Sequence, residues 1–371
     1  MMKPVFAFIL FSFFSVAVPA KAYDLVPLPA QPLGTPWPTE QWSVEATPAA
    51  LAAIVDEAFY NSVVPGTRAV VVIHRGVLVA ERYAPGFAAD QKFLSQSMAK
   101  SVLNTLVGLR VKDGALDVKA RAPVAEWQGD ERRHITLTNL LQMSSGLGFN
   151  EAYFNPVTSD VLPMLFGEGR KDMGTFAAQS PLAYEPGTHW SYASGTTNLI
   201  SRIVRDSVGG DRASYLQFMR TRLFAPIGMT SAQPEFDASG TFVGSSWLHA
   251  TARDWARFGL FSLRGGIWED KALLPEGWID WSRGPLAYSP VGNYGAHFWL
   301  NVGDIETGEG RRIAAGPRDA FMASGHRGQY VVMVPSKDLV IVRLGRTGYA
   351  DYPRVTEWMG RLINWFEDVE R

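Results

Sequence analysis

Two pairs of apolar, β-branched runs stand towards the two ends of the chain, and each pair predicts a β-hairpin. In the first pair, residues 68–73 and 77–83 are separated by a short turn that contains a glycine. In the second pair, residues 329–334 and 339–344 are separated by a turn that begins with proline. Strands at both ends of a chain can meet in one antiparallel sheet, and we expect them to do so here.

Apolar residues at helical spacing fill most of the remaining chain. A helix is expected to open at Thr47-Pro48, with proline at its first position. Further helices are predicted over residues 135–141, 196–208, 212–224, 252–263 and 354–367, and one more strand over 293–302. This order predicts an α/β fold in which an antiparallel sheet is flanked by terminal helices and a mainly helical region is inserted.

The expected domain organisation follows from this order. Residues 45–95 and 241–371 form the α/β domain, and 96–240 form the inserted helical domain. Residues 23–44 hold five prolines and no apolar period, so they are expected to form an extended arm lying on the body. This layout predicts a cleft between the two domains.

The first 22 residues have the pattern of a secretory signal peptide. Lys3 supplies a positive start, residues 5–18 are apolar, and Ala20-Lys21-Ala22 offers a small-residue cleavage site. The alternative is a membrane anchor, but the apolar stretch is short for one. We therefore expect a secreted protein, in a bacterial periplasm, with no stable membrane anchor after cleavage.

Composition excludes several classes of function. The 371 residues carry 35 basic and 36 acidic side chains and no basic stripe, so nucleic acid is not an expected partner. The chain has no cysteine, which excludes disulfides and a thiol nucleophile, and its six histidines are scattered. Neither a metal site nor a cofactor is expected. An α/β-hydrolase is disfavoured because no Gly-x-Ser-x-Gly occurs.

The first candidate for chemistry is Ser97-Met-Ala-Lys100, followed by an apolar helical run. Residues three apart share one face of a helix, so the amine should lie beside the hydroxyl. A lysine in an apolar cleft can lose its proton and then accept one from serine. The alternative is a helix cap followed by a surface lysine, and the motif alone does not decide between them.

The second candidate is Tyr192, in a segment rich in glycine and serine just before a helix. Its phenol is expected to share with Lys100 the proton that leaves Ser97. The alternative is an ordinary packing residue before a helix.

The third candidate is the segment 323–329, which leads into the second hairpin. Gly325 and Gly328 allow the backbone to approach a ligand closely. The N–H of Gln329, together with that of Ser97, is expected to form an oxyanion hole. The alternative is a glycine-containing turn that enters an edge strand.

In their order and spacing, the three segments resemble the serine β-lactamase-related hydrolases, the superfamily of class C β-lactamases, DD-peptidases and esterases. The matches are Ser97-Met-Ala-Lys100, Tyr192-Ala-Ser194 and His326-Arg-Gly328, and the resemblance covers about residues 45 to 370. Within the superfamily, 254–259 and the second hairpin look closest to 6-aminohexanoate-dimer hydrolase-like members. The resemblance implies a β-lactamase/transpeptidase-like fold.

The resemblance also implies acyl-enzyme chemistry on a small-molecule ester or amide. Ser97 would attack the carbonyl while Lys100 and Tyr192 handle the proton. Ser194, His326 and Gly328 would bind the substrate, with Tyr153, Trp190, Trp299 and Tyr330 as weaker candidates for the walls of the cleft.

Two departures from the family pattern bear on the substrate. His326 stands where β-lactamases and DD-peptidases have lysine, and Ser194 stands where class C enzymes have asparagine. Arg327 is expected to point away from the cleft because side chains alternate along a strand. These departures favour an esterase or amidase. The alternatives are a DD-peptidase or β-lactamase, and a non-catalytic binding relative of the same fold.

Overall fold

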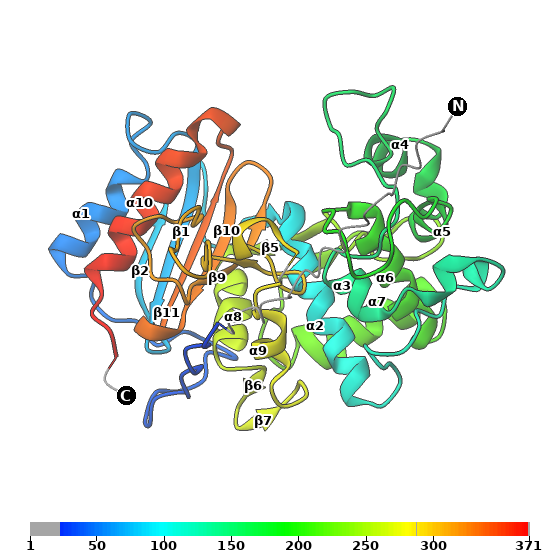
Figure 1. Ribbon diagram of the computed structural model, residues 1–371. Coiled ribbons are helices and arrows are strands. Elements are labelled where there is room, and N and C mark those ends of the chain that lie inside the picture. Colours follow the sequence, from blue (N-terminus) through cyan, green and yellow to red (C-terminus); the bar gives the residue numbers. More distant parts are fainter. Residues whose placement is uncertain (1–22, 287, 370–371) are drawn as a thin grey trace, which may run out of the picture.

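The computed structural model describes residues 23–286 and 288–369. Its main sheet has six strands in the order β2-β1-β11-β10-β9-β8, and all neighbouring strands are antiparallel (Figure 1). The strands are β1 (Thr67–His74), β2 (Val77–Tyr83), β8 (Trp299–Leu300), β9 (Phe321–Gly325), β10 (Gln329–Val334) and β11 (Leu339–Gly345). Both predicted hairpins are present, and the pairing of β1 with β11 joins them in one sheet.

Helices cover both faces of this sheet, which explains why its strands are almost continuously apolar. Val70 and Val72 of β1 pack in one cluster with α1 (Ala49–Glu57) and α10 (Tyr352–Trp365). The alternate residues of β1 face the opposite side, where they pack with α8 (Ala252–Leu263). Figure 1 shows α1 and α10 side by side on the outer face.

The helical part of the chain surrounds one buried helix. Its members are α2 (Ala99–Lys112), α3 (Leu137–Leu141), α4 (Val161–Phe166), α5 (Met173–Ala178), α6 (Ser194–Ser207) and α7 (Arg212–Met219), and α9 (Trp278–Ser282) lies later in the chain. Every residue of α2 from Ala99 to Leu109 is buried. A helix buried all round cannot shift without disturbing its neighbours, so α2 is a rigid support for whatever it carries.

The structure corrects two sequence predictions about strands. The strand expected over 293–302 is reduced to the two residues of β8. The segment 323–329, expected to lead into the second hairpin, begins with the end of a separate strand, β9, whose residues Phe321–Gly325 are all buried. Two small sheets were also missed, one of β3 (Lys92–Leu94), β5 (Leu248–Thr251) and β4 (Gln233–Pro234), the other of β6 (Ile267–Trp268) and β7 (Lys271–Ala272).

Residues 23–44 contain no helix or strand, and buried arginines of the body hold them. Arg257 and Arg264 of the α8 region donate to the carbonyls of Pro38 and Pro29, and Arg283 donates to Val26. The predicted signal segment, 1–22, lies outside the described residues. Within the described part of the chain, no helix is long and apolar enough to cross a membrane.

His297 is a buried histidine between the sheet and the helical part. Its Nδ1–H donates to the carbonyl of Leu141 at 2.6 Å, and its Nε2 accepts from the hydroxyl of Thr197 at 3.0 Å. Burial lowers the pKa of His297 to about 3, and Lys100 contributes to the lowering. The folded protein therefore keeps this ring neutral.

We predict that His297 makes stability fall in acid. Below the ordinary histidine pKa of about 6.5, His297 binds a proton in the unfolded chain but stays neutral in the folded protein. The free energy of unfolding should decrease by up to about 1.4 kcal/mol per pH unit from this group between pH ~6.5 and ~3.

The measurement is urea unfolding from pH 7 to 4.5. His297→Asn, which tolerates the positive φ of 59° at this position, should be less stable at pH 7 but lose less stability in acid. Exposed His189 supplies the control as His189→Asn. If the free energy of unfolding falls equally steeply with decreasing pH in the wild type and in His297→Asn, the prediction is wrong.

Candidate active site

Ser97 lies in a 3-10 turn, η1 (Gln96–Met98), and not in the α-helix that the sequence predicted for it. The α-helix α2 begins only at Ala99. Residues three apart are eclipsed in a 3-10 turn, so Lys100 still faces the serine. The Nζ of Lys100 lies 3.4 Å from the Oγ of Ser97.

Lys100 is 2% exposed and its amine donates to neutral oxygens. Besides Ser97, these are the Oγ of Ser194 at 3.2 Å and the carbonyl of Ser245 at 3.0 Å. No carboxylate of the described residues forms an ion pair with this amine. The three oxygens come from η1, α6 and the loop before β5, so the amine links three separate parts of the chain.

Ser194, which accepts a hydrogen bond from Lys100, also donates to Glu151. The Oγ of Ser194 donates to the carboxylate of Glu151 at 2.5 Å, and the backbone N–H of Ser194 donates to the other oxygen at 2.7 Å. Ser194 is the first residue of α6, whose free N–H groups attract a carboxylate. Ser194 is fully buried. Its hydroxyl contacts Lys100 and Glu151, and Ser194 does not line the cleft.

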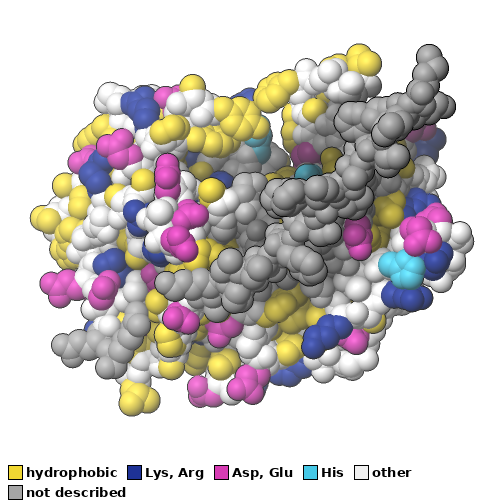
Figure 2. All heavy atoms as spheres, viewed as in Figure 1, with side chains coloured by type: hydrophobic (Ala, Val, Ile, Leu, Met, Phe, Trp, Pro, Cys, Tyr) yellow, Lys and Arg dark blue, Asp and Glu magenta, His cyan; other side chains and the backbone are white. Residues whose placement is uncertain are grey.

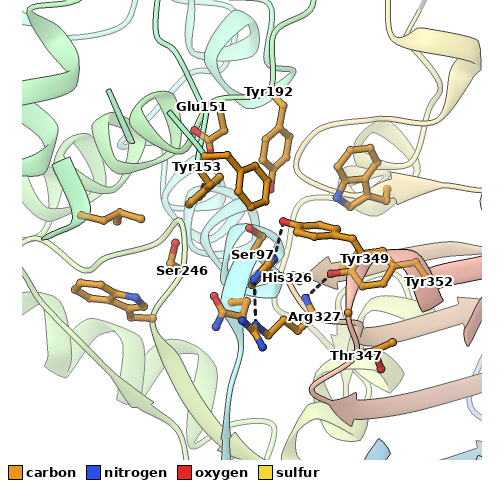
Figure 3. A pocket seen from close by; sticks show the side chains of 18 of the residues that line it. Ser97, Glu151, Tyr153, Tyr192, Ser246, His326, Arg327, Thr347, Tyr349 and Tyr352 are labelled. Carbon is orange, nitrogen blue, oxygen red and sulfur yellow. Dashed lines mark hydrogen bonds between the residues drawn. The ribbon is translucent and has the colours of Figure 1, made fainter. Parts of the chain in front are cut away.

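Tyr192 lies against the same amine. The Nζ of Lys100 is 4.8 Å from the centre of the Tyr192 ring, within cation–π range. Figure 3 shows the ring of Tyr192 extending towards Ser97 in the cavity that both residues line. The phenol hydroxyl makes no hydrogen bond with another described residue, so it is available to a bound molecule.

These residues open into a cleft of about 580 Å³. Eight of its twenty lining residues are aromatic, namely Tyr153, Phe154, Phe166, Tyr192, Trp247, Trp299, Tyr349 and Tyr352. Figure 2 shows hydrophobic side chains on both sides of the hollow at the upper edge of the molecule. An apolar cleft with a few convergent polar groups is typical of a small-molecule site.

The third segment approaches Ser97 through Gly325, and not through Gly328 or Gln329. A side chain at Gly325 would meet the carbonyl oxygen of Ser95 at 2.4 Å, which shows how closely the end of β9 lies against η1. Gly328 and Gln329 do not line the cleft. The prediction that the Gln329 N–H faces Ser97 therefore does not fit the structure, because Gln329 pairs with Gly325 from the next strand of the sheet.

His326 and Arg327 follow β9 in a turn, and both line the cleft. The Nδ1 of His326 lies 2.9 Å from the hydroxyl of Tyr349, and the Nε of Arg327 donates to the Nε2 of His326 at 3.3 Å. Burial, and then the charge of Arg327, lower the pKa of His326. Arg327 was expected to point away, but strand alternation does not apply in a turn where its φ is 63°.

The sequence as a whole matches the β-lactamase family profile over residues 51–361. The chain belongs to the β-lactamase family. The predicted resemblance and the β-lactamase/transpeptidase-like fold are thereby confirmed.

Individual relatives agree with the family assignment. The 6-aminohexanoate-dimer hydrolase of Paenarthrobacter ureafaciens is 26% identical over 328 residues, which are 82% of this chain and 78% of that protein. The lovastatin esterase of Penicillium rubens is 33% identical over 111 residues, which are 27% of this chain and 24% of the esterase. A Bacillus anthracis structure, provisionally named a 6-aminohexanoate-dimer hydrolase, superimposes with a TM-score of 0.69 at 21% identity, over 92% of this chain and 91% of that one.

The remaining predicted wall residues of this β-lactamase-family chain divide into two groups. Tyr153 and Trp299 line the cleft, and the hydroxyl of Tyr153 donates to Glu151 at 3.0 Å. Burial and the carboxylate of Glu151 raise the pKa of Tyr153. Trp190 lies behind the wall, packed edge-on against Trp299. Tyr330 is buried in the core on the far face of the sheet, so its prediction was wrong.

Sequence reasoning missed several residues of the site. Glu151, Trp247, Tyr349 and Tyr352 all line the cleft, yet none lies within a recognised motif. Only its position in the sequence pointed to Glu151, which lies after the predicted helix of 135–141 and two residues before Tyr153, a predicted wall residue. Among the described residues, no group of three His, Cys, Asp or Glu could hold a metal ion.

The close approach of Gly325 to η1 generates a prediction. Gly325→Ala should push the end of β9 away from Ser97, which lowers stability by about 1–3 kcal/mol. It should also slow the labelling of Ser97 by a fluorophosphonate probe at least about tenfold. Labelling rate and urea unfolding are measured together.

The control is Gly348→Ala. Gly348 lines the same cleft, has an ordinary φ of −72°, and leaves 4.0 Å to the nearest atom, so an added methyl group fits there. Equal labelling of both variants would show that the position of β9 does not matter to Ser97.

Proposed function

We propose that the protein is a secreted serine hydrolase that cleaves ester or amide bonds through an acyl-enzyme on Ser97. The observation that carries the proposal is the 3.4 Å contact between the Ser97 hydroxyl and the buried amine of Lys100, at the floor of an open apolar cleft. A serine next to a buried amine is the arrangement that activates a hydroxyl nucleophile. The hydrolase names of the relatives support the same class of reaction.

In this proposal the Ser97 Oγ forms a bond to the carbonyl carbon as its proton passes to Lys100 or Tyr192. The carbonyl π electrons move to oxygen, and the tetrahedral intermediate then expels the alcohol or amine, which takes up the proton. Water attacks the acyl-enzyme in the same way and releases the acid and free Ser97. Tyr192 fits the role of proton carrier because its ring covers the amine and its hydroxyl is free among the described residues.

We assign the oxyanion hole to the backbone N–H groups of Ser97 and His326. His326 is the first residue after β9 and lines the cleft, whereas Gln329 does not. The contact of Gly325 with Ser95 supports the assignment, because it holds the end of β9 next to the nucleophile. Two such donors stabilise the charge that develops on the carbonyl oxygen.

The aromatic wall favours substrates with apolar arms, which supports an esterase or amidase. We further propose export to a bacterial periplasm, on the signal-like pattern of residues 1–22. A non-catalytic relative of the fold remains the rival class. The rival predicts that purified protein neither reacts with a fluorophosphonate nor turns over any ester.

The central test is Ser97→Ala. Hydrolysis of p-nitrophenyl esters, 6-aminohexanoate dimer, D-alanyl peptides and nitrocefin is compared between the wild type and this variant. Loss of the only acylated oxygen should reduce turnover of every accepted substrate at least about a thousandfold. The fold should be retained, as judged by circular dichroism.

The exposed serine at position 62 gives the control, Ser62→Ala, which should keep full activity and full fluorophosphonate labelling. Turnover by Ser97→Ala above that of an empty-vector preparation would overturn the assignment of the nucleophile.

Glu151 is proposed as a positioning residue, and Glu151→Gln tests it. Ser194 donates to both carboxylate oxygens, so an amide must present its NH₂ group to one donor and lose that bond. The Ser194 hydroxyl then no longer holds Lys100 in place. We expect kcat to fall about 10–100-fold and the pH–rate profile to shift, with little change in KM.

Glu168→Gln is the matched control, since Glu168 is exposed and pairs only with Lys171 among the described residues. If Glu151→Gln leaves both kcat and the pH profile unchanged, Glu151 does not position the amine.

A further inference from the structure

A second cavity, of about 410 Å³, adjoins the cleft. It is formed by β3, by the start of β1, by the end of β11 and by the turn after β9. Nothing in the proposed reaction uses this cavity. Its walls are polar, unlike the aromatic walls of the cleft.

The lining of this second cavity, which we call the basic pocket, is strongly one-sided in charge. Of its eleven lining residues, four are arginine or lysine and none is acidic, although the whole chain has 35 basic and 36 acidic residues. The four are Arg68, Lys92, Arg327 and Arg346. Its histidine, His249, is already paired with Glu235 at 2.8 Å.

None of these four cations has an anionic partner among the described residues, and the side chain of Arg327 donates only to His326. The guanidinium of Arg68 lies over the ring of Phe87 at 5.0 Å, and the charged groups of Lys92 and Arg346 make no hydrogen bond or ion pair with described residues. Elsewhere the chain pairs its arginines readily, as Arg253 pairs with Glu81 at 2.6 Å. Like charges gathered without counter-charges repel one another, and an anion bound between them relieves that repulsion.

A buried cation adds to the positive potential. Arg343 is fully buried, and its guanidinium donates to the carbonyl of Gly328 and to the hydroxyls of Thr67 and Thr347. Burial lowers the pKa of Arg343 to about 10, so it still carries its charge at neutral pH. This arginine lies beneath the turn that separates the two cavities.

The basic pocket and the cleft share two residues, Gln96 and Arg327. Gln96 precedes Ser97 directly, so the pocket begins next to the proposed nucleophile. Both shared residues have left-handed backbones, with φ of 49° and 63°, which side chains other than glycine adopt rarely. Such strain is typically kept where it serves a site.

We propose that the basic pocket is an anion subsite that holds a carboxylate on one arm of the substrate while the ester or amide bond lies at Ser97. The inference rests on the proposed function for its reaction, and it goes further by naming the substrate class as esters or amides with a carboxylate-bearing arm. The aromatic cleft takes the apolar arm of the same molecule.

The test compares matched pairs of substrates that differ only in charge. For the acyl arm the pair is p-nitrophenyl hydrogen adipate and p-nitrophenyl methyl adipate. For the leaving arm it is 4-butanoyloxybenzoate and its methyl ester. The wild type should prefer the anionic member of at least one pair, and added salt should reduce the preference because these cations are exposed.

The test variant is Lys92→Gln/Arg346→Gln. It should lower kcat/KM for the preferred anionic substrate about tenfold and leave the neutral twin within about twofold. The control, Arg75→Gln/Lys119→Gln, removes the same two charges at exposed positions outside both cavities and should change neither rate.

A second readout does not depend on turnover. Ser97→Ala protein should bind adipate in calorimetry, and adding the Lys92→Gln/Arg346→Gln changes should abolish binding. If the neutral twins are hydrolysed but the anionic preference is absent or survives the double variant, the anion subsite is wrong and the hydrolase stands. Binding of inorganic phosphate in the basic pocket without any effect on substrate preference would also overturn it. If no ester is turned over, the proposed function fails, and the calorimetry still shows whether the basic pocket binds a carboxylate.

Discussion

The buried amine of Lys100 is the constraint on which the arrangement of this protein depends. Lys100 is 2% exposed, so its amine must give its hydrogens to protein oxygens, because an unsatisfied buried donor costs about 1–3 kcal/mol. Here the oxygens come from Ser97, Ser194 and Ser245. The amine thus fixes η1, the start of α6 and the loop before β5 relative to one another, and Glu151 extends the chain of contacts.

Rigid packing on both sides holds Lys100 and its hydrogen-bond partners in fixed positions. On the helical side, α2 is buried along most of its length. On the other side, the sheet is covered on both faces, and Gly259 of α8 lets the helix approach Val331 and Val340 closely. The cleft lies where these two rigid parts meet, so small groups such as the Gly325 backbone can be held against η1 with little freedom to move.

Most of the fold follows from local patterns, and the exceptions have physical causes. The hairpins were predictable because their strands are apolar and β-branched and are bounded by turn residues. β9 was missed because its last residues, Ala323-Ser-Gly325, have the composition of a turn and only burial makes them a strand. For the same reason, the backbone N–H expected to face Ser97 was assigned to Gln329, which instead pairs with Gly325. The sequence does not distinguish the roles of Gly325 and Gly328. Gly328 is glycine because the turn requires its positive φ of 77°, whereas Gly325 is glycine because a side chain there would collide with the backbone of Ser95.

The sequence alone determined the order of Ser97, Lys100 and Tyr192 and the family to which that order belongs. Local spacing sufficed for the first two, because residues three apart meet in any helical turn. Tertiary structure alone decided that Glu151 supports Ser194, that the cleft wall is aromatic, and that unpaired cations gather beside Gln96. These groups come from segments far apart in the chain, and their proximity is set by how the sheet and the helices pack, which no local pattern records.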